Sequence, residues 1–176
     1  MNSLIISAVG SDRPGIVSEI SGVITSHGGN VEESRMSRLG SDFAIIMLIS
    51  VIPDWQESLE VALQSISELK IITKPTITQE SSDNIQCQID LCGADNEGII
   101  KVMSKYLAGK SINIIDMQTH ISHAPVSGTP LFNLKAITVI PENVNLTNIQ
   151  SDLNQIAQKL GVEIRVHQSN SIAEAR

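Results

Sequence analysis

The sequence lacks any run of 18 consecutive apolar residues, and its first residues, Met1 to Ser3, carry no basic stretch of the kind that opens a secretory signal. We therefore expect neither membrane insertion nor export, and we expect the chain to be cytoplasmic. Aromatic residues are also scarce, with two Phe, one Tyr and one Trp among 176 residues. Few side chains are thus available to stack on the bases of single-stranded nucleic acid.

Positive charge is in short supply as well. The chain has 12 Lys and Arg against 19 Asp and Glu, which gives a formal net charge of −7. An acidic chain without a basic stripe suits a phosphate backbone poorly, so direct nucleic-acid binding is excluded as an expectation. The 41% of hydrophobic residues indicates a folded globular chain instead of a disordered one.

Cysteine occurs only twice, at Cys87 and Cys92. The two residues lie five apart in what we interpret as one strand, so their side chains point to opposite faces at a separation of about 16 Å, beyond disulfide reach. We expect both to be buried apolar thiols in a reducing compartment.

The most informative feature is an internal repeat. Gly10-Ser-Asp-Arg-Pro-Gly15 recurs as Gly93-Ala-Asp-Asn-Glu-Gly98, and each copy follows a short apolar run. Further along, Ile-Ser-Val-Ile-Pro ending at Pro53 resembles Ile-Thr-Val-Ile-Pro ending at Pro141. The offset between copies grows from 83 to 88, which indicates about five residues inserted near 122–127. The chain is therefore predicted to be a tandem duplication.

The predicted domains follow from the repeat. We expect domain 1 at residues 1–80, a linker at 81–84 within the polar run 79–84, domain 2 at 85–168, and a C-terminal tail at 169–176.

Each copy is predicted to be β-α-β-β-α-β, which places two helices on one face of a four-stranded antiparallel sheet. This is an α+β, ferredoxin-like plan. We expect Asp12 to cap the first helix and Pro14 to lie in its first turn. The second helix should carry Trp55, Leu59, Leu63, Ile66 and Leu69 on one face. In the second copy, a clean stripe from Leu146 to Leu160 should end at Gly161.

The turn before the first helix is the place where the sequence favours ligand chemistry. A strand that runs into a helix N-terminus leaves backbone N–H groups and a partial positive charge, which suit a small carboxylate. Gly15 has no side chain to block access to that backbone, and Arg13 adds a cation beside it. The alternative interpretation is purely structural: Asp12 caps, Pro14 starts the helix and Gly15 packs.

The combination of this turn with His27-Gly-Gly-Asn-Val-Glu at the second strand resembles the ACT domain, a small regulatory module that binds amino acids. The run Asn30-Val-Glu-Glu-Ser-Arg-Met-Ser-Arg-Leu-Gly40, with two copies and no catalytic domain, is similar to the glycine cleavage system transcriptional repressor family. That resemblance implies a regulator without catalytic activity that senses a small amino acid, glycine above all. It also implies action through a DNA-binding transcription factor and a homo-oligomer formed through ACT sheets.

Carried over by position, the resemblance implies a first site and a weaker second one. The first set is Asp12, Arg13, Pro14, Gly15 and Ile16, with Asn30 opposite on the second strand. The second set is Asp95, Asn96, Gly98, Ile99 and Asn113. Because Asn96 and Glu97 replace Arg13 and Pro14, the second loop should hold an anion less well.

The sequence favours neither a metal site nor a cofactor. His120 and His123 have no nearby Cys, Asp or Glu cluster at ligand spacing. Two other functions remain open at this point. One is an acylphosphatase-type hydrolase, which would need an arginine-rich phosphate cradle. The other is an ACT module that mediates only dimerisation or interaction and has no small-molecule ligand.

Overall fold

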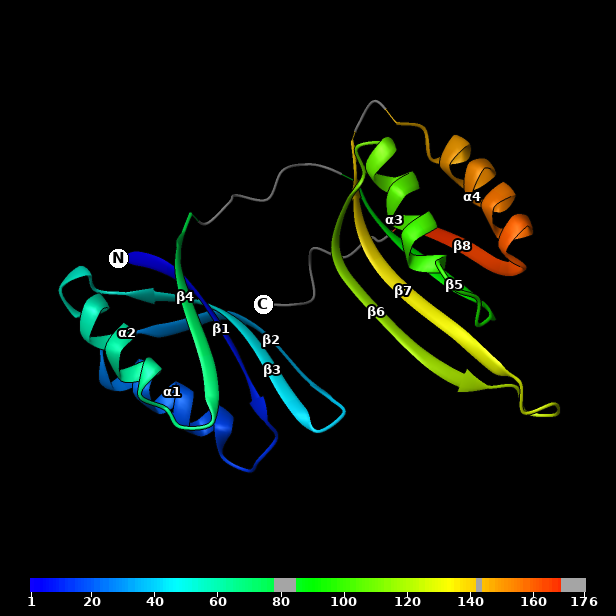
Figure 1. Ribbon diagram of the computed structural model, residues 1–176. Helices are drawn as coiled ribbons and strands as arrows, with labels where there is room; N and C mark the ends of the chain where they lie inside the picture. Colours follow the sequence, from blue (N-terminus) through cyan, green and yellow to red (C-terminus); the bar gives the residue numbers. More distant parts are fainter. Residues whose placement is uncertain (78–84, 142–143, 169–176) are drawn as a thin grey trace. The chain divides into compact units, whose positions relative to one another are not determined.

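The computed structural model describes residues 1–77, 85–141 and 144–168. The chain forms two compact units, Met1–Glu80 and Ser81–Arg176 (Figure 1). The predicted linker at 81–84 and the predicted tail at 169–176 lie outside the described residues. Among the helices of the described part, none has the length and apolar character needed to cross a membrane.

The first unit has the predicted order of elements. Its strands are β1 (Asn2–Ser11), β2 (Asn30–Leu39), β3 (Asp42–Val51) and β4 (Leu69–Thr76), and its helices are α1 (Ile16–Ser26), the short 3-10 helix η1 (Pro53–Trp55) and α2 (Gln56–Gln64). The sheet order is β2-β3-β1-β4 with antiparallel neighbours. Pro75 lies in β4, an edge strand, where a missing N–H costs no ladder bond on the open side.

The second unit repeats the arrangement. Its strands are β5 (Ile85–Ala94), β6 (Asn113–His123), β7 (Pro130–Ile140) and β8 (Val162–Gln168), and its helices are α3 (Ile99–Gly109) and α4 (Leu146–Leu160). The sheet order is β6-β7-β5-β8, again antiparallel. The predicted α+β fold class, with two ferredoxin-like units, is confirmed.

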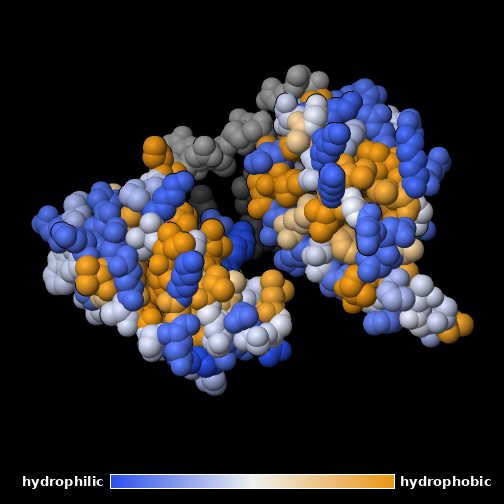
Figure 2. Space-filling view, in the orientation of Figure 1, coloured by the Kyte–Doolittle hydropathy of each residue, from blue (hydrophilic) through white to orange (hydrophobic). Residues whose placement is uncertain are grey.

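Each unit has its own core between its helices and one face of its sheet. In the first unit, alternate residues of β1 and β3 meet Ile20, Ile24, Leu59 and Leu63 from the helices, all fully buried. In the second unit, Met103, Leu107 and Leu153 play the same part. Hydrophobic residues also reach the surface in patches on both units (Figure 2).

The first helices begin later than predicted. α1 starts at Ile16, with Gly15 at the N-cap in the left-handed conformation (φ 91°) and no side chain capping it. The prediction that Asp12 caps this helix is therefore wrong, and Pro14 precedes the first turn instead of lying in it. α3 starts the same way behind Gly98 (φ 83°). A side chain at the cap would need this positive φ, which favours glycine.

Two further predictions need correction. Trp55 is about half exposed (49%), because η1 interrupts the helix before α2, while Ile66 and Leu69 lie beyond the end of α2. Cys87 is buried as expected, but Cys92 is exposed. The two thiols point to opposite sheet faces, and only one of those faces is covered by helices.

The repeat also differs from its sequence alignment by one residue. Gly10 pairs with Phe43 and Gly93 pairs with Phe132, so the third strands correspond at an offset of 89, not 88. A slip of one residue moves every side chain to the other face. Thr138 therefore takes the place of buried Ile49, and its hydroxyl donates to the Cys87 carbonyl at 3.0 Å.

The close approach of β4 to Gly10 gives a first prediction. A Cβ at Gly10 would lie 2.2 Å from the Glu68 carbonyl oxygen, whereas a Cβ at Gly22 in α1 would meet nothing within 4 Å. Gly10→Ala should lower the free energy of unfolding by about 1–3 kcal/mol. Gly22→Ala should raise it by up to about 1 kcal/mol through helix propensity. Urea unfolding of both variants checks the pair; equal effects would contradict the clash.

The lone tyrosine gives a second prediction. Partial burial, with a hydrogen bond from Tyr106 Oη to Asp152 (3.1 Å), raises the pKa of Tyr106 to about 12. Because the unfolded tyrosine ionises first, at about pH 10, stability should fall as pH rises from about 10 through 12. Absorbance at 295 nm should show this late titration, and Asp152→Asn should bring it to lower pH. Titration near pH 10 in the native protein would refute it.

Candidate ligand-binding loop

The loop between β1 and α1 holds the residues that the sequence singled out in the first unit. The Asp12 N–H donates to the Ser41 carbonyl in the β2–β3 turn (2.9 Å). Gly15 then turns the chain into the helix, and the first helical bond runs from the Glu19 N–H to the Gly15 carbonyl (2.8 Å). The N–H groups of residues 16 to 18 therefore precede the helical ladder. The Ile16 side chain lies in the core, so only its backbone can face a ligand.

Arg13 is engaged by two carboxylates. Its Nη2 donates directly to Glu19 Oε2 in the first turns of α1, and its Nε lies 3.3 Å from Glu68 Oε2. The hydrogen bond to Glu19 is the main reason that the pKa of Arg13 is raised. Sequence reasoning expected Arg13 to be a free cation beside the helix N-terminus. The structure instead makes it the tie between the loop, α1 and the start of β4.

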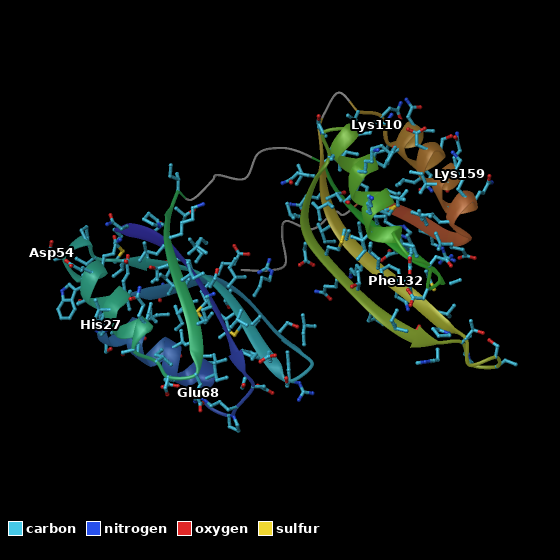
Figure 3. All side chains as sticks on the ribbon, in the orientation of Figure 1. His27, Asp54, Glu68, Lys110, Phe132 and Lys159 are labelled. Atoms are coloured by element: carbon cyan, nitrogen blue, oxygen red, sulfur yellow. The ribbon has the colours of Figure 1, made fainter. Side chains whose placement is uncertain are left out.

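Glu68 is the residue that sequence reasoning missed. It lies directly before β4, with a positive φ of 68° (Figure 3). Its counterpart in the second unit is Gly161, which has nearly the same φ of 67° directly before β8. A glutamate in this left-handed position is unusual. The only sequence signal would have been its alignment with Gly161, which needs the correct offset between copies.

The charge around the first loop is mixed. Asp12 Oδ2 lies 3.7 Å from Arg38 Nη1, which comes from the end of β2. With Arg13, Glu19 and Glu68, the loop region thus contains three acids and two bases. A simple anion would meet net negative charge here. A zwitterion, which brings one charge of each sign, suits the loop better.

The second loop keeps the backbone but changes the tie. Asn96 Nδ2 donates to the Leu160 carbonyl at the end of α4 (2.9 Å), so a neutral hydrogen bond does the work of the Arg13 ion pairs. Asp95 and Gly98 occupy the positions of Asp12 and Gly15, and the Ile99 side chain is buried like that of Ile16. This loop offers the same backbone without a cation.

Neither strand asparagine lies beside the loop of its own unit. Ser11 pairs with Asp42, whereas Asn30 pairs with Ser50, eight residues further along β3, or about 27 Å. Asn113 is displaced in the same way, since Ala94 pairs with Leu131 and Asn113 pairs with Val139. The expectation of Asn30 opposite the loop is wrong within the unit, because α1 carries the chain to the other end of the sheet before β2 begins. The Asn30 amide donates to Glu32 instead (3.2 Å).

Metal chemistry has no evident place in the described residues, where no group of three or more His, Cys, Asp or Glu side chains could hold an ion. His120 lies on β6 at the edge of a shallow groove of about 500 Å³ on the second sheet, with Asp90 and Lys135. His123 ends the same strand.

Comparison with known proteins agrees with the fold. Residues 2–74 match the ACT domain family model. The chain is 26% identical over 168 residues to the glycine cleavage system transcriptional repressor of Escherichia coli, covering 91% of this chain and 86% of that protein. A UPF0237 protein of Methanococcus maripaludis is 33% identical over 69 residues, covering 38% of this chain and 76% of that protein.

Two solved structures resemble the whole chain. One is an unknown protein from Galdieria sulphuraria, with a TM-score of 0.82, 31% identity and coverage of 96% of this chain and 98% of that one. The other is provisionally assigned to a glycine cleavage system transcriptional repressor, with a TM-score of 0.72, 23% identity and coverage of 97% and 98%. The second likeness supports the tandem fold.

Proposed function

The chain is a tandem ACT-domain protein that resembles the glycine cleavage system transcriptional repressor family, and from this premise we propose that it senses a small amino acid, glycine first. In this proposal it modulates transcription of glycine cleavage genes through a DNA-binding protein partner. The observation that carries the proposal is that the similarity to the Escherichia coli repressor extends over 168 residues and thus through both units. A regulatory role follows from that similarity, and the ligand and partner are our extension of it.

The geometry of the first loop supports a zwitterionic ligand. The N–H groups at the start of α1 and the Arg13 guanidinium can donate to a carboxylate. The carboxylates of Asp12 and Glu68 can accept from an ammonium group. Both charges of a free amino acid thus have partners among residues that the fold already brings together. A ligand carboxylate must compete with Glu19 and Glu68 for Arg13, so we expect modest affinity.

A protein partner, and not DNA, is the proposed output. The net charge of −7 opposes binding to a phosphate backbone. If the amino acid changes the affinity for a DNA-binding partner by some factor, the partner must change the affinity for the amino acid by the same factor. This reciprocity makes the regulatory proposal measurable from either side.

Amino-acid binding is tested first by calorimetric titration of the full chain. We expect heat of binding for glycine, and weaker or no binding for acetate and methylamine, which each carry one of its two charges. Arg13→Ala should weaken glycine binding about tenfold or more, since a hydrogen bond to a charged group contributes roughly 1.5–3 kcal/mol.

The matched controls come from the same fold. Asn96→Ala removes the equivalent tie in the second loop and should leave the stronger binding event unchanged. Asn30→Ala should also leave it unchanged, because Asn30 lies at the other end of the sheet. If none of the twenty amino acids raises the melting temperature, no native-state ligand exists among them and the chain is an interaction module without a small-molecule ligand.

A further inference from the structure

The two units differ most on the sheet face that their own helices do not cover, here called the open face. In the first unit the open face is aliphatic at its centre. Val9, Ile46 and Ile72 are 51%, 47% and 58% exposed, and Ile5 and Leu48 are half-buried beside them. All five belong to β1, β3 and β4 and alternate with core residues along their strands.

The second unit has charged or polar residues at the equivalent positions. The central row of the first sheet reads Arg35, Ile46, Ser7 and Ile72 across the four strands. The same row of the second sheet reads Gln118, Lys135, Asp90 and Arg165. The second face is what an antiparallel sheet shows to water. The first is an exposed apolar patch on the same backbone, and such patches mark interaction surfaces.

The charges on the first open face are arranged by edge. The neighbouring row reads Glu33, Leu48, Ile5 and Lys74, with the acid on the β2 edge and the base on the β4 edge. Glu32 adds a second acid near the β2 edge, where it accepts from the Ser50 hydroxyl (2.6 Å). Arg35 on the same edge is held by Glu33 at 2.9 Å. Lys70 lies on the β4 edge with Lys74.

This pattern is self-complementary under one symmetry operation. A two-fold axis parallel to the strands, passing between two stacked sheets, lays the β2 edge of one copy over the β4 edge of the other and keeps each row over itself. Glu33 then faces Lys74 of the second copy, and Leu48 faces Ile5. An axis perpendicular to the strands would instead place like edges together.

We propose that the open face of the first sheet is the interface between two copies of this chain, related by a two-fold axis parallel to the strands. Two sheets stacked in this way lie about 10 Å apart, and their inner side chains interdigitate. The surface of four strands spaced by about 4.8 Å and about eight residues long is roughly 500 Å² per copy. A total of about 1,000 Å² lies at the lower limit for a specific interface, so the dimer should dissociate on dilution.

The aliphatic contact is tested with the full chain by sedimentation velocity over a concentration series. The sister sheet supplies the replacements: Ile46→Lys and Ile72→Arg introduce residues that the same fold carries at 135 and 165, so each variant should keep its circular dichroism spectrum. Each should raise the dimer dissociation constant about tenfold or more. Val61→Lys is the control, since Val61 on α2 is 64% exposed on the helical side of the unit.

The charge arrangement is tested by reversal. Glu33→Lys and Lys74→Glu should each weaken the dimer, because each places like charges opposite each other. The double variant Glu33→Lys/Lys74→Glu should dimerise again, and an equimolar mixture of the two single variants should form a mixed dimer. A monomer at every concentration, a dimer insensitive to Ile46→Lys, or a double variant that stays monomeric would each overturn the proposal. None of these outcomes depends on whether an amino acid binds.

Discussion

The approach of the last strand of each unit to the glycine near the end of its first strand is the constraint on which the candidate site depends. Gly10 faces Leu69 and Gly93 faces Val162, and in both places a side chain on the glycine would overlap the facing residue or the residue just before it. The last strand must enter beside the loop, so the residue before it takes a positive φ, as Glu68 and Gly161 do. The loop is thereby fixed between the sheet and the end of a helix.

That constraint also explains why Arg13 is not the free cation that its sequence position indicates. The residue after α2 lies against the loop, and a glutamate there reaches the guanidinium. Both carboxylates that bind Arg13 are at least one-third exposed, so each ion pair contributes little to stability. Their effect on ligand choice is larger, because they reduce the attraction for a lone anion and leave acceptors for an ammonium group.

The sequence predicted what depends on local signals and failed where distant geometry decides. The apolar stripe of α4 and the stop at Gly161 were correct, since period and left-handed conformation are properties of a few neighbouring residues. The partner of Asn30 was wrong, because a strand direction, and not a motif, decides which end of the sheet it occupies. The offset of 88 was wrong because Ile-Ser-Val-Ile and Ile-Thr-Val-Ile align well at a register that the ladder shifts by one residue.

The duplication separates what the fold requires from what function can use. Gly10 and Gly93 and the buried Ile16 and Ile99 are shared by the copies, and each has a packing reason to be shared. They therefore say little about ligands, although they supply much of the motif. Arg13 and Asn96 differ, as do Ile46 and Lys135 on the open faces, and these exposed differences give the two units distinct surfaces. Asp12 and Asp95 are the exception, exposed yet identical, and they cap neither helix. Because the fold gives no reason for this shared carboxylate, it is the loop residue whose retention points most directly to a ligand carrying positive charge.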